Sequence, residues 1–183
     1  MSEERTVDAV DVPLRTAVRE LEAHAAESGW DQPARLFALV STADLVAREP
    51  ALASVLGLSA DGPEAEVSLT PVEQDEVPAE TALEAVLEQI MWPEDVLGCA
   101  AVLERIVLPP AADQQLPADP AEAQRFAADH PDREEVRIVA AATRGGSTYC
   151  ALRMRTHDDA HAVVESPDLV PALLELLRST LEN

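Results

Sequence analysis

The chain has 183 residues and a formal net charge of -22 at pH 7, because 35 acidic side chains face 13 arginines and no lysine. Such a charge disfavours binding to nucleic acid and to anionic membranes, since both attract proteins through clusters of cationic side chains. The lack of lysine also excludes mechanisms that need a side-chain amine, such as Schiff-base formation or a lysine that holds phosphate.

The first third of the chain follows the pattern helix, strand, helix. Apolar residues three and four positions apart predict a helix that Gly29 ends. A short apolar run between Pro33 and Ser41 predicts a buried strand. Ser41 or Thr42 can then cap a second helix, which Pro50 interrupts. The predicted ranges are disorder at 1–10, helix at 12–28, strand at 35–40, helix at 42–57 and loop at 58–66.

The middle of the chain contains the clearest helical pattern. Val67 and Leu69 alternate with polar residues and predict a strand that Pro71 ends. An apolar stripe at helical spacing predicts a helix from Pro78 to Met91. The stripe consists of Leu83, Val86, Leu87, Ile90 and Met91. The next predicted ranges are a buried strand at 97–108, a proline-rich connection at 109–131 and, within it, a short helix at 121–128.

The last third of the chain predicts a β-hairpin followed by a helix. Two β-like runs within 135–156 flank the pair Gly145 and Gly146, which is typical of a tight turn. The final helix is predicted to start with Asp168 as its cap. We therefore predict an α+β fold with a largely antiparallel sheet, in which the C-terminal β-hairpin packs against several helices in a single domain over 1–183.

The arginines of the hairpin are the main candidate binding residues. A loop of the two glycines would mix charged and apolar side chains on each face, whereas a three-residue loop from Gly145 to Ser147 separates them. In this favoured register Arg137, Arg153 and Arg155 share one face, with Arg137 nearly opposite Arg155. Two interpretations are open. The arginines bind a carboxylate, a phosphate or an acidic partner segment, or they pair with carboxylates of the same molecule.

A second candidate is a ridge of glutamates. Glu80, Glu84 and Glu88 repeat every four residues, on the side of the predicted helix away from its apolar stripe. The ridge is either a solvated outer face or a docking surface for a basic partner. It lacks the pattern of a calcium-binding loop.

The sequence contains little that indicates catalysis or metal binding. His157 and His161 have a spacing that binds zinc on a helix, but no HExxH motif and no third ligand accompany them. Cys99 and Cys150 each lie in an apolar run and form no CxxC pair, so we predict buried, unreactive thiols. There is no GxSxG nucleophile elbow. The sequence predicts no metal, no cofactor and no catalytic residue.

These observations favour a protein that acts by binding other proteins. The N-terminal segment is acidic and lacks the apolar core of a signal peptide, and no apolar run approaches the length of a membrane span, so we predict a cytoplasmic protein. Our first hypothesis is a non-enzymatic interaction module, chaperone-like or regulatory, with a protein partner or a second copy of itself. The alternative is a small enzyme or ligand-binding protein that uses the arginine face for an anionic ligand.

Six segments form a distinctive combination, and they are WDQPARLFALV (30–40), TADLVAREPALA (42–53), MWPEDVLGCA (91–100), HPDREEVRIVAAATR (130–144), CALRMR (150–155) and DLVPALLELLRSTL (168–181). Together they resemble a family of small acidic actinobacterial proteins for which no activity is established. The resemblance spans most of the chain. It implies a bacterial, cytoplasmic, single-domain protein and no particular chemistry. At the level of architecture alone, small acidic α+β proteins also include secretion chaperones that hold a partner chain.

Overall fold

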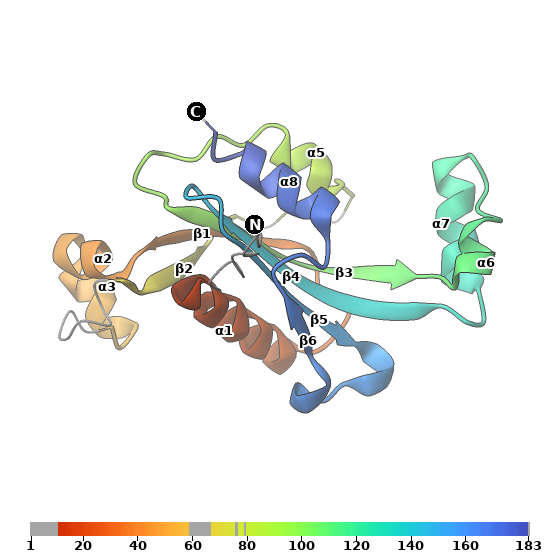
Figure 1. The fold of residues 1–183 in the computed structure, drawn as a ribbon, viewed down its shortest axis with the longest axis horizontal. Helices are drawn as coiled ribbons and strands as arrows, with labels where there is room; N and C mark the ends of the chain where they lie inside the picture. The colour runs from red at the N-terminus through yellow and green to blue at the C-terminus, as the bar shows by residue number, and fades with distance from the viewer. Residues whose placement is uncertain (1–10, 59–66, 76, 79, 183) are drawn as a thin grey trace, which may run out of the picture.

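Strands of one antiparallel sheet run in the order β2-β1-β3-β4-β5-β6, and helices lie on both faces of the sheet (Figure 1). The computed structural model describes residues 11–58, 67–75, 77–78 and 80–182. The strands are β1 (Arg35–Ser41), β2 (Leu69–Glu73), β3 (Gly98–Val107), β4 (Glu134–Thr143), β5 (Thr148–Met154) and β6 (Val164–Ser166). The predicted α+β class and the largely antiparallel sheet are confirmed.

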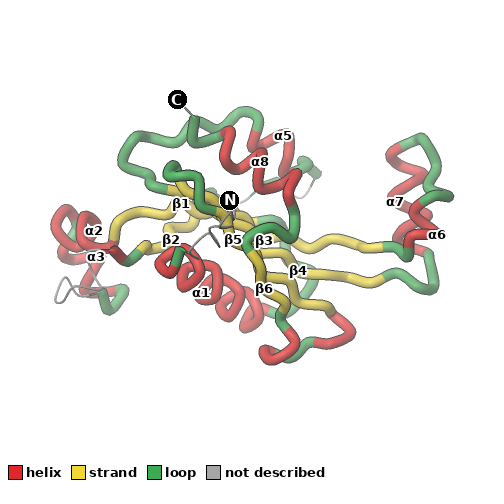
Figure 2. Tube along the Cα trace, in the orientation of Figure 1, coloured by secondary structure: helices red, strands yellow, loops and turns green. Residues whose placement is uncertain are grey.

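The helices differ in the part of the sheet that they cover (Figure 2). Helix α1 packs on one face, and α5 and α8 pack on the other. Helices α2 and α3 follow β1, while α6 and α7 lie far from both layers. The helices are α1 (Val12–Ser28), α2 (Thr42–Arg48), α3 (Pro50–Val55), α5 (Leu83–Leu87), α6 (Pro110–Asp113), α7 (Pro120–Asp129) and α8 (Pro171–Ser179). None of the described helices is both long enough and apolar enough to cross a membrane.

The core has two apolar layers separated by a sheet of small side chains. On one side Leu14, Val18 and Leu21 of α1 pack on the sheet. On the other side Leu174 and Leu177 of α8 do the same. Between them the central strands carry alanine at six positions with no exposed surface, which are Ala100, Ala101, Ala140, Ala141, Ala142 and Ala151. Alanine side chains are short, so both helical layers can lie close to the sheet backbone.

The predicted first helix and its neighbour are confirmed at their starts. Asp11 caps α1 by accepting a hydrogen bond from the Leu14 backbone amide at 3.0 Å. Gly29 ends that helix with a φ of 78°, which favours glycine. Ser41 caps α2 in the same way, with 3.3 Å between its hydroxyl oxygen and the amide of Asp44.

The helix expected over 78–91 is only five residues long in the structure. Helix α5 begins after Ala82, which has no side chain able to cap it. Past Leu87 the backbone amides of Gln89 and Ile90 bond only three residues back, so the helix ends in tight turns. The repulsion among glutamates four residues apart also disfavours a longer helix.

Two predicted boundaries near prolines are wrong. Pro71 does not end its strand but lies within β2, opposite Leu39, because β2 is an edge strand and needs no amide on its outer side. Asp168 does not cap the last helix. Val170 precedes α8, and Pro171 is its first residue. The three residues of β6, which pair with β5, were not predicted because so short a strand carries little periodicity.

The long strands β3 and β4 extend beyond the rest of the sheet. They pair with each other over ten residues, while β1 pairs with β3 only as far as Val102. The ribbon formed by their outer ends carries α6 and α7 at its tip (Figure 1). We call residues 103–135 the arm. The proline-rich connection of the sequence analysis therefore forms the tip of an arm, and α7 buries none of its residues.

Candidate functional site

The predicted hairpin is formed by β4 and β5, but its loop lies one residue earlier than expected. The backbone amide of Thr143 donates to the carbonyl of Ser147 at 2.9 Å, so the loop consists of residues 144–146. Gly146 has a φ of 93°. A three-residue hairpin loop needs a positive φ at its last position, and glycine adopts it without strain.

This loop keeps the side chains of β4 and β5 on their predicted faces and shifts the pairing by two residues. Arg137 therefore lies opposite Arg153. The predicted pairing of Arg137 with Arg155 is wrong, since Arg155 follows β5 in the 3-10 turn η1 (Arg155–His157). The face that carries Arg137 and Arg153 is covered by α1 and is not open to solvent.

Glu22 of α1 lies against both of these arginines. Its side chain and those of Arg137 and Arg153 are all at most 8% exposed. Glu22 Oε1 accepts hydrogen bonds from Arg153 Nη2 and, at 2.9 Å, from Nε. Glu22 Oε2 lies 3.9 Å from Arg137 Nη1, and neither atom has a hydrogen-bond partner among the described residues. This buried carboxylate offsets the repulsion between two arginines that face each other across the strand pair.

Trp30 extends the cluster to the loop after α1. The Arg137 guanidinium carbon lies 4.4 Å from the centre of the indole ring, and that of Arg155 lies 5.6 Å away, so both make cation–π contacts. Trp30 Nε1 donates to Asp158 at 3.1 Å, and Arg153 Nη1 donates to the same carboxylate at 3.1 Å. These two hydrogen bonds lower the pKa of Asp158 below its ordinary value.

Arg155 is held by two further carboxylates. It forms a bidentate pair with Asp31, at 2.8 and 3.0 Å, and also contacts Glu135 at 3.2 Å. The hydrogen bond from Arg155 lowers the pKa of Asp31. Every arginine of the predicted face, including Arg137 and Arg153, thus has a carboxylate of the same molecule beside it. An anionic ligand would have to displace these carboxylates.

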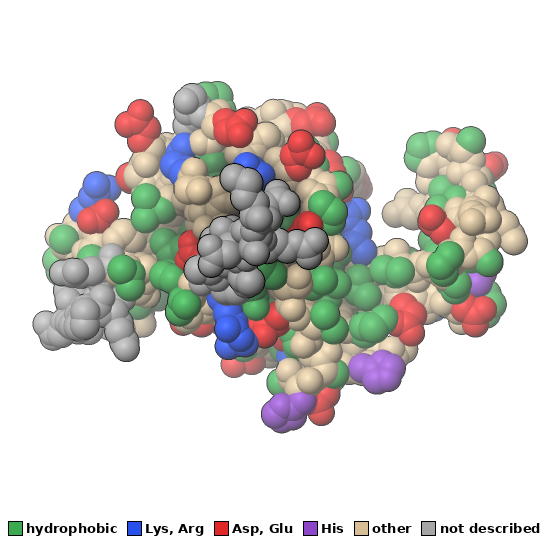
Figure 3. All heavy atoms as spheres, viewed as in Figure 1, with side chains coloured by type: hydrophobic (Ala, Val, Ile, Leu, Met, Phe, Trp, Pro, Cys, Tyr) green, Lys and Arg blue, Asp and Glu red, His purple; other side chains and the backbone are tan. Residues whose placement is uncertain are grey.

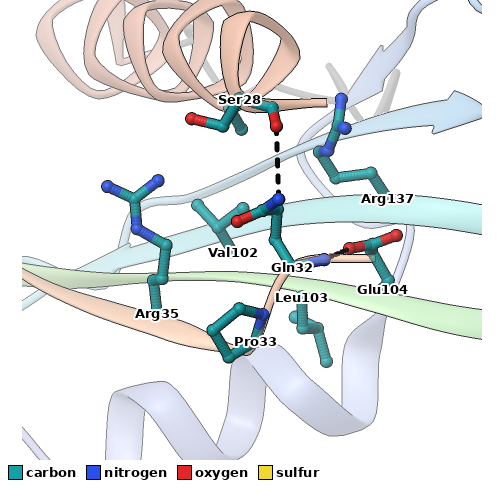
Figure 4. Close-up of a pocket in the computed structure, with 9 residues that line it drawn as sticks. Ser28, Gln32, Pro33, Arg35, Val102, Leu103, Glu104 and Arg137 are labelled. Carbon is teal, nitrogen blue, oxygen red and sulfur yellow. Dashed lines mark hydrogen bonds between the residues drawn. The ribbon is translucent and has the colours of Figure 1, made fainter. Parts of the chain in front are cut away.

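The cavities beside the cluster do not fit a bound anion. Figure 4 shows a small cavity in which Gln32 Nε2 donates to the Ser28 carbonyl at 3.2 Å and the Gln32 amide donates to Glu104. Its volume of about 10 Å³ holds one water at most. A second cavity of about 280 Å³ is bounded by the Arg19–Glu165 ion pair and by Arg153 with its partner Glu22, so its charged lining is balanced.

The predicted acidic ridge lies on the opposite face of the sheet. Glu84 is in α5 and forms an ion pair with Arg105 of β3, a partner that the sequence did not suggest. Glu80 precedes α5 and Glu88 follows its last residue, so the three glutamates do not share one helix. Both Glu80 and Glu88 are exposed.

An apolar groove that the sequence did not reveal adjoins Glu84. It has a volume of about 350 Å³ and lies between the start of α8 and the base of the arm. The Arg105–Glu84 ion pair borders it. Its apolar lining consists of Ile138, Val170, Pro171, Ala172, Leu173 and Leu176. No sequence pattern joins β4 to α8, so only the tertiary structure reveals this groove.

The remaining candidate residues form no reactive centre. His157 and His161 lie in separate 3-10 turns, and the described residues contain no group of three His, Cys, Asp or Glu side chains able to hold a metal ion. Cys99 and Cys150 are free and buried, as predicted. Burial raises the pKa of the Cys99 thiol to about 11 and also raises that of Cys150.

Comparison with known proteins gives one match. The model of the PPA1309-like protein family, for which no activity is established, matches residues 14–182. No curated protein and no solved structure matches the chain. The matched region includes both helical layers, the whole sheet and the arm. This protein therefore belongs to the PPA1309-like protein family.

Proposed function

We propose that the protein is a non-enzymatic interaction module, chaperone-like or regulatory, that holds a segment of a partner protein in the cytoplasm. The observation that carries this proposal is the apolar groove between α8 and the arm. Apolar surface in contact with water is unfavourable, so the free energy falls when a partner covers it. A site of this size suits a few side chains of a polypeptide.

The arm adds further apolar surface beside the groove. Val107 is 48% exposed and lies two residues beyond Arg105, on the same face of β3. Figure 3 shows a notch between the main body and the tip of the arm, with hydrophobic side chains on the arm at its base. A segment seated in the groove can therefore also contact the arm.

The arginine cluster supports a role in the fold and not a role in catalysis. Glu22, Asp31 and Asp158 already balance the charge of its guanidinium groups, and the adjoining small cavity holds one water at most. Separating buried arginines from their carboxylates costs more free energy than the binding of an exposed ligand usually provides. The groove is therefore the better candidate for function.

Two alanines allow a matched test of the groove. Ala172 and Ala51 are each the second residue of a helix that begins with proline, and both are exposed. Only Ala172 lines the groove. Ala172→Gln fills the groove without changing charge, and Ala51→Gln makes the same change in α3.

The experiment selects peptides from a random display library on the full-length protein and measures their affinity for both variants. We expect peptides that Ala172→Gln weakens about tenfold or more, a difference of about 1.4 kcal/mol, and that Ala51→Gln leaves unchanged. Peptides that bind both variants equally, or a library that returns no binder, would contradict the proposal.

A further inference from the structure

We infer that the occupant of the groove is a basic amphipathic helix of a partner protein, an inference that rests on the proposed function. The two parts of this statement, the helix and its charge, follow from different observations. Both concern the surroundings of the groove and not its volume.

Because the groove lies on a sheet face, its occupant must make its backbone hydrogen bonds within itself. The amides and carbonyls of β3 and β4 lie in the plane of the sheet, where they point toward the neighbouring strands or, where a strand has no neighbour, toward the edge of the sheet. Neither strand can offer those groups to a segment that lies on the face above Ile138. A segment buried there must bond its own amides and carbonyls, and a helix does so within itself.

The charge around the groove favours a basic occupant. Glu84 borders it, and Glu80 and Glu88 lie on either side of Glu84 in the chain. Arg105 is the one cation that lines the groove among the described residues. The net charge of -22 steers a basic partner toward the protein and repels a second copy of it.

The Arg105–Glu84 ion pair allows a test in which the direction of the change in affinity decides the result. Both side chains are nearly half exposed, at 44% and 41%, so the pair contributes little to the fold. A lysine or arginine of the occupant competes with Arg105 for Glu84. Removal of Arg105 should therefore strengthen binding of a basic helix, although it removes a contact of the protein.

Arg48 provides the matched control. It also forms an exposed ion pair, with Asp95, and it lies in α2, away from the groove. Arg105→Gln and Arg48→Gln thus change the net charge equally and each break one exposed pair. Glu88→Gln and Glu27→Gln form a second matched set, because Glu27 is exposed at the end of α1 on the other face.

The measurement is fluorescence anisotropy with two synthetic helical peptides that share leucine positions and carry either lysine or glutamate elsewhere. The lysine peptide should bind and the glutamate peptide should not. Arg105→Gln should raise affinity for the lysine peptide roughly two- to fivefold, and Glu88→Gln should lower it by a similar factor. The controls Arg48→Gln and Glu27→Gln should both change this affinity only slightly. Ala172→Gln should weaken it, and Ala51→Gln should not.

Equal responses to the matched variants would show that the lysine peptide binds the whole acidic surface, which overturns the inference. If library peptides bind in the groove but are acidic or uncharged, the inference fails and the proposed function stands. If neither the library peptides nor the lysine peptide respond to Ala172→Gln, both fail. A dimer that Ala172→Gln dissociates, seen by light scattering, would identify a second copy as the occupant. If Arg105→Gln does not fold, the Glu88 and Glu27 variants decide the result.

Discussion

Arg137 and Arg153 lie directly opposite each other on β4 and β5, and the buried carboxylate of Glu22 lies between their guanidinium groups. This contact joins α1 to the hairpin, because the one negative charge of Glu22 lies beside both arginines. Trp30 and Asp158 connect the same cluster to the segments that follow α1 and β5.

Replacement of Glu22 should destabilise the protein strongly. Glu22→Gln removes the carboxylate that two buried guanidinium groups share, and we expect a loss of about 3–5 kcal/mol in the free energy of unfolding, measured with urea. Glu27→Gln, an exposed change in the same helix, is the control and should cost less than about 0.5 kcal/mol. A loss below about 1 kcal/mol for Glu22→Gln would show that the cluster relaxes or admits water.

The Asp31–Arg155 pair should stabilise the fold in a pH-dependent way. The pKa of Asp31 is lowered from 3.8 in the folded state, so its contribution is complete above 3.8 and disappears as the pH falls through the lower, folded value. The urea midpoints of the wild type and Asp31→Asn should differ at neutral pH and converge in acid. Asparagine suits the test because residue 31 has a φ of 63°, which asparagine tolerates. A difference that persists unchanged in acid would contradict this account.

Gly98 should not tolerate a side chain. A Cβ added there would lie 2.5 Å from the carbonyl oxygen of Ala142, a backbone atom of the neighbouring strand. We expect Gly98→Ala to lower the free energy of unfolding by about 1–3 kcal/mol, because β3 and β4 must move apart. At Gly145 the nearest atom is 3.7 Å away, so Gly145→Ala should be close to neutral in the same urea titration. Equal effects of the two changes would contradict the prediction.

The two thiols should react only when the protein unfolds. Burial raises the pKa of Cys99 to about 11 and also raises that of Cys150, so the fraction of thiolate in the folded protein is small. At about pH 8 we expect slow reaction with Ellman's reagent in buffer and complete reaction of both thiols in denaturant. Rapid labelling of the folded protein would mean that the sheet opens locally at β3 or β5.

The sequence predicts those parts of the fold that local patterns specify. Helix α1 has its predicted range, because the apolar spacing and Gly29 indicate the same helix. The hairpin faces were predicted because a strand alternates its side chains. Its register was not, although Gly146 carries the signal, since the last position of a three-residue loop is the one that requires positive φ.

The candidate site was less predictable because its contacts join distant segments. Arg137 and Arg153 could be assigned to the hairpin, but the partners of the arginines, Glu22 and Asp31, lie more than 100 residues earlier in the chain, with no pattern that connects them. The same limit applies to Glu84 of helix α5, whose partner Arg105 comes from strand β3. Charge composition predicts that pairs form and not which residues form them.

Three successive residues of β4 set how far apart the two helical layers lie. Ala140 and Ala142 face α8, and Ala141 faces α1, each with a single methyl group between backbone and helix. A valine at any of them would have to lift one helix off the sheet, and loss of the methyl group would leave only a small gap. The centre of the molecule therefore leaves almost no freedom in side-chain size at these positions, whereas added bulk has room on α7 at the tip of the arm, a helix that buries none of its residues.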